Sequence, residues 1–362
     1  MKRSILLAAT LLIASIALVG CGGKKSNEKY EVALITDSGN IDDGSFNEGT
    51  WTGIVDYCKK NNISHEYYRP DGTASANHKD AINNAIQKGA KVVITPGFAF
   101  AQTINELQND PKYKDIQFLL IDTVPADAQG QPTTIAQNVH CISYMEEQAG
   151  YLAGYAAVKD GLTKLGFLGG QSIPPVLRYG YGFVQGANAA AAELGNQASV
   201  QVNFWCAGSF DPSDDIYNKM AGWYSQGTEA VFACGGKIYQ SATKAAEESG
   251  KKVIGVDTDQ VNDSTTIMTS ALKGIANSVS LALTDLYNNG CKWPATHAGQ
   301  SSTLGAANDC VGLPTDPNSW RFTSFTVEQY NALFEAVKTN AVTISNNTDT
   351  TPQVAIAVNY EQ

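Results

Sequence analysis

Three aspartates in this chain each follow directly on a short apolar run, and they are the residues best placed to do chemistry. Asp37 comes after "VALIT", Asp122 after "FLLI" and Asp257 after "VIGV". Ligands of parallel sheets collect beyond the carboxyl ends of the strands, so the three carboxylates are predicted to face one site. Carboxylate oxygens accept hydrogen bonds from hydroxyl and amino groups, which predicts a ligand rich in such donors. For each aspartate taken alone, a helix-capping role fits equally well.

Aromatic and glycine residues stand at the same kind of position. Phe46 and Phe210 follow predicted strands, and aromatic rings stack on flat apolar faces. Gly235 and Gly236 follow the run "VFAC" and predict a turn at the end of that strand. The combination predicts a pocket for a neutral, flat, hydroxylated molecule: a nucleoside fits best, and a free sugar is the close alternative. A phosphate-bearing ligand would instead require glycine-rich amides with lysine or arginine. Either ring, taken alone, is also consistent with a place in the core.

Signals for an enzyme are weak. The chain has no G-x-G-x-x-G after its first predicted strand, no Walker A motif and no G-x-S-x-G. Its four histidines show no metal-ligand spacing, and it contains no Cys-x-x-Cys pair. We therefore predict a binding protein that is not an enzyme and that has no cofactor and no metal site.

These residues would be positioned by alternating strands and helices. Short apolar runs of strand length alternate with longer helical patterns from residue 31 to residue 288. The alternation predicts an α/β fold of parallel sheets with helices on both faces. The strands are continuously apolar, as in strands that are buried on both faces. The predicted strands are 31–36, 65–68, 91–95, 117–122, 164–169, 200–206, 230–234, 252–256 and a last one at 353–358.

The first residues predict a processed leader and a lipid anchor. Lys2 and Arg3 precede an apolar run, which ends in Leu18-Val19-Gly20-Cys21, the pattern of a bacterial lipobox. Residues 1–20 are predicted to be the signal peptide. Cys21 would carry the diacylglyceryl group and palmitate, and residues 21–30 would form a polar tether. An ordinary secretory signal with a chance cysteine is the alternative. The prediction places the protein on the extracytoplasmic face of the cell membrane, held by lipid.

The net charge excludes one class of partner, and the cysteine content predicts a disulfide. The formal net charge is −10 over 362 residues, which argues against nucleic acid as a partner. Seven cysteines occur, so six remain once Cys21 is assigned to lipid. Cys291 and Cys310 flank a loop-like stretch, and we predict a disulfide between them in an oxidising compartment. The other four lie in apolar runs and are predicted to be core residues.

The segment "TDSGNIDDGSFNEGTWTGI" resembles the opening motif of the basic membrane protein family of bacterial lipoproteins. Members of this family are nucleoside-binding components of ABC transporters, of the purine nucleoside receptor type. The resemblance continues in "VVITPGFAF", "EEQAGYLAGYAA", "VFACGG", "VIGVDTDQ" and "TSALKG", in order, from about residue 31 to about residue 312. It implies a periplasmic-binding-protein-like type I fold, with two Rossmann-like lobes joined by three crossovers. The first lobe is expected to comprise 31–143 and 269–298, and the second lobe 144–268 and 299–362.

The resemblance also implies which residues hold the ligand. Asp37 and Asn47 would contact the base, and Phe46 and Phe210 would sandwich it. Asp257 and Lys273 are expected on the ribose, and Gly236 is expected to allow a close approach of the backbone. The full implied set is Asp37, Phe46, Asn47, Asp122, Phe210, Gly236, Asp257 and Lys273.

The implied function is the capture of nucleosides for an ABC importer, with its permease and ATPase as partners. A sugar-binding protein and a sensor or adhesin of the same fold are alternatives. A nucleoside hydrolase is a third, because "TDSGNIDD" loosely resembles the aspartate clusters with which such enzymes bind calcium. The lipobox and the two lobes argue against the hydrolase.

Overall fold

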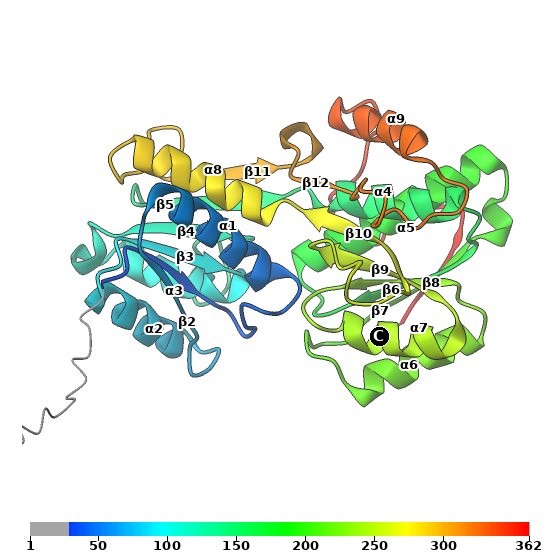
Figure 1. Cartoon of the computed structure of the whole chain (residues 1–362), viewed down its shortest axis with the longest axis horizontal. Helices are drawn as coiled ribbons and strands as arrows, with labels where there is room; N and C mark the ends of the chain where they lie inside the picture. Colours follow the sequence, from blue (N-terminus) through cyan, green and yellow to red (C-terminus); the bar gives the residue numbers. More distant parts are fainter. Residues whose placement is uncertain (1–28, 362) are drawn as a thin grey trace, which may run out of the picture.

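The computed structural model describes residues 29–361, so the predicted signal peptide, Cys21 and nearly all of the tether lie outside the described residues. Within this range the chain builds two α/β lobes, each around one sheet (Figure 1). No helix between residues 29 and 361 combines the length and the apolar character needed to cross a membrane.

The first lobe contains a six-stranded parallel sheet in the order β11-β5-β4-β3-β1-β2. Alternate side chains of β1 face opposite sides of the sheet, as the period of two requires. Val32 and Leu34 pack with the residues of α1 and α8, whereas Ala33 and Ile35 pack with those of α2 and α3. The strands are β1 (Val32–Ile35), β2 (His65–Tyr68), β3 (Val92–Pro96), β4 (Gln117–Ile121), β5 (Val139–Tyr144) and β11 (Gln300–Leu304). The helices are α1 (Phe46–Asn61), α2 (Ser75–Gln87), α3 (Ala101–Gln108) and α8 (Ile275–Asn288), with the short turns η1 (Phe98–Phe100) and η2 (Pro111–Tyr113).

The second lobe contains a seven-stranded sheet in the order β12-β10-β9-β8-β6-β7-β13, in which only the short edge strand β12 is antiparallel. One face is covered by α4 and α5, which approach so closely that a Cβ on Gly154 would lie 2.1 Å from the carbonyl oxygen of Phe183. The other face is covered by α6 and α7. The strands are β6 (Lys164–Gly169), β7 (Gln201–Cys206), β8 (Ala230–Cys234), β9 (Lys252–Asp257), β10 (Ile267–Lys273), β12 (Val311–Gly312) and β13 (Ala357–Tyr360). The helices are α4 (Glu146–Lys159), α5 (Pro174–Leu194), α6 (Asp214–Ser225), α7 (Tyr239–Ser249) and α9 (Val327–Lys338), with η3 (Gln197–Ser199) and η4 (Ala306–Asn308).

The chain crosses between the lobes three times. The crossings lie between β5 and α4, between β10 and α8, and between β11 and η4 (Figure 1). The predicted fold, two Rossmann-like lobes joined by three crossovers, is therefore confirmed.

Two of the expected lobe borders are wrong. Strand β10 pairs with β9 up to Leu272 opposite Asp257, so residues 269–273 belong to the second lobe and the chain leaves it only at Gly274. Strand β11 pairs with β5 along its whole length, so residues 300–304 belong to the first lobe. Both borders move because each strand completes its hydrogen-bonded ladder before the chain crosses.

The predicted disulfide between Cys291 and Cys310 is also wrong, because both cysteines are free. Cys310 packs against Gly274, directly before the first residue of α8, whereas Cys291 lies beyond the last residue of the same helix. A helix of this length, 14 residues, spans roughly 20 Å. A disulfide requires Cα atoms within about 7 Å of each other.

Candidate functional site

A cavity of about 340 Å³ lies between the two lobes and is lined by residues that follow the strands of both sheets. All eight residues predicted to hold a ligand line this cavity, so the structure brings the whole predicted set together. They are Asp37, Phe46, Asn47, Asp122, Phe210, Gly236, Asp257 and Lys273.

Strand order gives the cavity two ends. In the first lobe Asp122 follows β4, which is the neighbour of β5 and its crossover, whereas Asp37 follows β1, two strands further out. In the second lobe Lys273 ends β10 at another crossover, and Asp257 ends the adjacent strand β9. We call the end formed by Asp122, Asp257 and Lys273 the hinge end, and the end that contains Asp37 the outer end.

Two aspartates at the hinge end have an unusual backbone conformation. Asp122 has φ = 64° and Asp257 has φ = 63°, a left-handed region that costs free energy for any residue with a Cβ. They occupy equivalent places, each at the end of a parallel strand, one in each lobe. Such strain concentrates at ligand sites because it directs a side chain that regular backbone would turn elsewhere.

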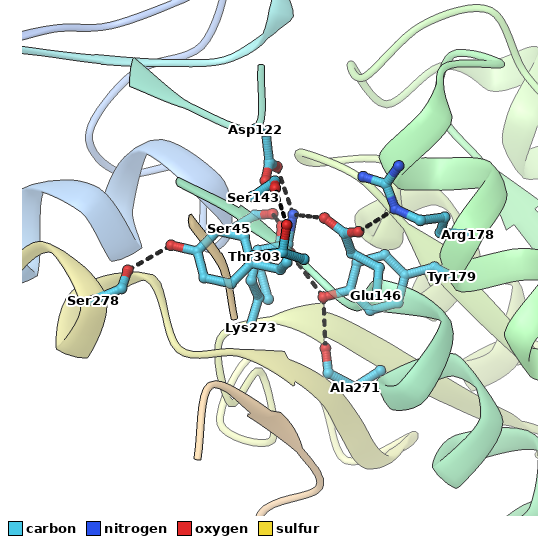
Figure 2. A network of polar contacts seen from close by, with 12 residues as sticks. Ser45, Asp122, Ser143, Glu146, Arg178, Tyr179, Ala271, Lys273, Ser278 and Thr303 are labelled. Carbon is cyan, nitrogen blue, oxygen red and sulfur yellow. Dashed lines mark hydrogen bonds and ion pairs between the residues drawn. The ribbon is translucent and has the colours of Figure 1, made fainter. Parts of the chain in front are cut away.

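Lys273 is the centre of a buried charge network at the hinge end (Figure 2). Its Nζ lies 2.6 Å from Asp122 Oδ2, 3.0 Å from Glu146 Oε1 and 4.0 Å from Asp257 Oδ1. On the far side, Arg178 Nε donates to Glu146 Oε2 at 2.6 Å. Burial alone would lower the pKa of Lys273, but the three carboxylates outweigh it and raise that pKa, so the ammonium stays charged.

The carboxylates of the hinge end resist ionisation. Burial raises the pKa of Asp122 to about 7, against the opposing pull of Lys273. Burial also raises the pKa of Asp257, although Lys273 and a hydrogen bond from Ser45 counteract it. The site therefore holds carboxyl groups whose charge depends on their one shared cation.

Free hydrogen-bonding capacity at the hinge end faces the cavity. Asp122 Oδ1 is buried and has no hydrogen-bond partner among residues 29–361. Lys273 donates a hydrogen bond to Asp122 and forms ion pairs with Glu146 and Asp257 without hydrogen bonds, which leaves ammonium hydrogens for a ligand. A donor and an acceptor side by side suit hydroxyl groups, which both donate and accept.

Asp257 joins the lobes as well as lining the cavity. Ser45, from the first lobe, donates its hydroxyl to Asp257 Oδ2 at 2.6 Å. Tyr179, from the second lobe, donates to Asp257 Oδ1 at 3.2 Å. Each carboxylate oxygen keeps a further lone pair, so Asp257 can still accept from a ligand.

At the outer end, Asn47 orients carboxylates and has no donor left over. Its Nδ2 donates to Asp37 Oδ1 at 2.9 Å and to Asp43 Oδ2 at 2.8 Å, which uses both amide hydrogens. Asp43 in turn accepts the backbone N–H groups of Ser45, Asn47 and Glu48 at the start of α1. Asp37 Oδ2 remains available to the cavity, and burial raises the pKa of Asp37.

The two predicted rings come from different lobes. Phe46 is the first residue of α1, and its ring centroid lies 5.2 Å from Lys273 Nζ. Phe210 lies over a floor of glycines: a Cβ on Gly170 would be 2.3 Å from its Cδ1, and one on Gly235 would be 2.7 Å from its Cε1. Gly170 follows β6 and Gly235 follows β8, so glycines in two loops make room for the ring, and this accounts for a glycine directly after β8.

Several residues of the site were not predicted. Ser45, Glu146, Arg178 and Tyr179 complete the polar network, and Phe98 lines the cavity with 41% of its surface exposed. Two of them gave a signal in the sequence: Phe98 follows the predicted strand 91–95, and Glu146 belongs to a glutamate pair that opens a helix otherwise made largely of small and aromatic residues. Among residues 29–361 no cluster of histidine, cysteine or carboxylate side chains is suited to hold a metal ion.

Comparisons with known proteins agree with this geometry. A family model described as "ABC transporter substrate-binding protein PnrA-like" matches residues 30–347. The chain is 28% identical over 282 residues to the "ABC transporter nucleoside-binding protein BmpA" of Lactococcus lactis, which covers 72% of this chain and 75% of that one. It is 25% identical over 322 residues to "Basic membrane protein A" of Borreliella burgdorferi, and the match covers 86% of this chain and 88% of that protein. The crystal structure of a solute-binding protein of an ABC transporter system from Aeropyrum pernix has the same fold, with a TM-score of 0.74 and 18% sequence identity. The superposition covers 88% of this chain and 94% of that one.

Proposed function

The chain belongs to the family of PnrA-like ABC transporter substrate-binding proteins, and from this premise we propose that it binds nucleosides, purine nucleosides above all, in the cavity between its lobes. The observation that carries the proposal is the hinge end. There, Asp122, whose Oδ1 has no hydrogen-bond partner among residues 29–361, and Lys273, which keeps ammonium hydrogens, line the same cavity. A relative named as a nucleoside-binding protein supports this choice of ligand.

The ligand would lie along the cavity from the hinge end to the outer end. Ribose hydroxyls would accept from Lys273 and donate to Asp122 and Asp257. Phe46 and Phe210, one from each lobe, would hold the two faces of the base by stacking. Asp37 would accept a hydrogen bond from an N–H group of the base. In this arrangement Asn47 positions Asp37 and does not itself donate to the ligand.

Binding would be coupled to closure of the lobes. A ligand that touches both lobes is bound more tightly by the closed form, and it shifts the population toward that form. An ABC permease with its ATPase would then recognise the closed protein and accept the ligand.

We propose that the protein is no enzyme, since its matched relatives are transporter components. We further propose a lipid anchor at Cys21 on the extracytoplasmic face of the membrane.

Isothermal titration calorimetry of the purified protein tests the proposal. Adenosine, guanosine, inosine, uridine and cytidine are titrated in parallel with ribose, arabinose and the free bases. We expect heat from the purine nucleosides and weaker binding of ribose or base alone. Tight binding of a sugar without any nucleoside signal would refute the proposal. Release of hypoxanthine from inosine would refute the assignment as a non-enzyme. Mass spectrometry of the membrane-extracted protein tests for acyl groups on Cys21.

A further inference from the structure

A segment near the C-terminus, residues 316–325, lies against the loop between β9 and β10, residues 258–266, and we call this segment the strap. Arg321 in the strap donates from Nη1 to the carbonyls of Ser264 at 3.1 Å and Ile267 at 3.0 Å, and from Nη2 to that of Val261 at 3.1 Å. Its backbone N–H donates to Met268 O at 3.0 Å. A planar guanidinium can hold three carbonyls in a fixed geometry, which a lysine ammonium cannot.

The strap is itself fixed at its other end. Asp160, at the end of α4, accepts the backbone N–H groups of Thr323 at 2.7 Å, Ser324 at 2.6 Å and Phe325 at 3.0 Å. Ser319 in the strap donates to the side chain of Asp259 in the loop. The loop is thus attached to the body of the second lobe through side chains of the strap.

The opposite side of the same loop contacts the first lobe, next to Asp257, which lines the cavity. Gln260 is almost fully buried: its Oε1 accepts from Val256 N at 3.1 Å, and its Nε2 donates to Gly44 O at 2.8 Å. Thr258 Oγ1 donates to the same Gly44 oxygen at 2.7 Å. Gly44 directly precedes Ser45, the residue that donates to Asp257. The loop therefore determines how the first-lobe turn meets the carboxylate of Asp257.

We propose that Arg321 is a positioning residue for Asp257, acting through the β9–β10 loop. By fixing three carbonyls of the loop and its end, Arg321 holds Asp257 and the Gly44 turn in the arrangement that the ligand meets. Arg321 does not line the cavity, so it acts without touching the ligand. The inference rests on the proposed function, because Asp257 is the proposed ribose contact.

The experiment compares Arg321→Gln and Arg321→Lys with Asp160→Ala, which releases the strap at its other end and leaves the guanidinium contacts in place. Adenosine and adenine are titrated into each folded variant. We expect Arg321→Gln to weaken adenosine binding about tenfold, within the range seen for residues that act on a site from a distance. The affinity for adenine should change less than about twofold, and in an Asp257→Asn background the effect of Arg321→Gln on adenosine should largely vanish. Arg321→Lys should fall in between, and Asp160→Ala, which loosens the strap but keeps the guanidinium contacts with the loop, should weaken adenosine binding less than Arg321→Gln does.

Hydrogen exchange gives a second readout that does not depend on a variant folding. In the wild-type protein, adenosine should slow exchange in residues 258–266 and also in the strap. If Arg321→Gln lowers the melting temperature while its folded form binds adenosine as the wild type does, the inference is wrong. Unchanged exchange in both segments would also overturn it. Failure of the wild type to bind any nucleoside would instead overturn the proposed function, and this inference with it.

Discussion

Replacing Lys273 by methionine tests whether the hinge end is a charge network that depends on one cation. The Lys273 side chain is 3% exposed and is shared by the carboxylates of Asp122, Glu146 and Asp257. At 3.0 Å, the separation of Lys273 Nζ from Glu146 Oε1, and an effective dielectric constant of about 20, a unit charge pair attracts by about 5–6 kcal/mol, part of which offsets the cost of burial. Removing one partner of a buried pair destabilises proteins by about 3–5 kcal/mol. We expect a loss of that size at pH 8.

The loss of stability caused by Lys273→Met should become smaller as the pH falls. Without the ammonium, the pKa values of Asp122 and Asp257 rise further, because Lys273 is the largest of the influences that oppose burial, which already raises the pKa of Asp122 to about 7. The folded variant therefore binds protons that the unfolded chain has already released, and its stability relative to the wild type increases from pH 8 toward pH 5. Protonated carboxyls no longer repel one another, so the defect is partly repaired.

Urea denaturation, followed by fluorescence and circular dichroism at pH 5, 6, 7 and 8, measures this effect. Lys338→Met is the matched control. Lys338 Nζ lies 3.0 Å from Asp309 Oδ1, the same separation as Lys273 from Glu146, but Asp309 is 70% exposed. We expect no measurable change for the control, because exposed ion pairs contribute little. Equal losses in the two variants, or a loss in Lys273→Met that is independent of pH, would refute the reasoning.

Three further substitutions and one labelling experiment test the site, the helix packing and the cysteines. Phe46→Ala should weaken nucleoside binding by roughly 1–3 kcal/mol in calorimetry while the ligand-free protein melts nearly as before; a core-like loss of about 3–5 kcal/mol in stability would show the ring to be structural. Asp257→Asn should weaken the binding of ribonucleosides more than the binding of free bases in calorimetry. An equal loss of affinity for both would show that this carboxylate does not contact the ribose. Gly154→Ala should lower the melting temperature strongly, since its Cβ would lie 2.1 Å from the backbone of α5, and unchanged melting would contradict the close helix packing. Alkylation of the unfolded, unreduced protein should label both Cys291 and Cys310, and protection of this pair would restore the disulfide.

The sequence alone determined the features that depend on local order along the chain. Alternating apolar runs and helical patterns predict the parallel sheets, because strand and helix periods are local properties. The position directly after a strand predicts that Asp37, Asp122 and Asp257 share a site, since the topology of parallel strands brings their carboxyl ends to one edge. All three line the cavity that the structure contains.

Only the tertiary structure decided which distant side chains meet. The contacts of Glu146 with Lys273, and of Arg321 with the β9–β10 loop, join residues that no pattern in the sequence links. The same holds for the amide of Asn47, whose hydrogens are used by neighbouring carboxylates, and for Cys310, which a whole helix separates from Cys291. Such pairings follow from the way helices pack and from where the chain crosses between lobes. Packing satisfies many contacts at once, so no single stretch of residues contains the information that fixes them.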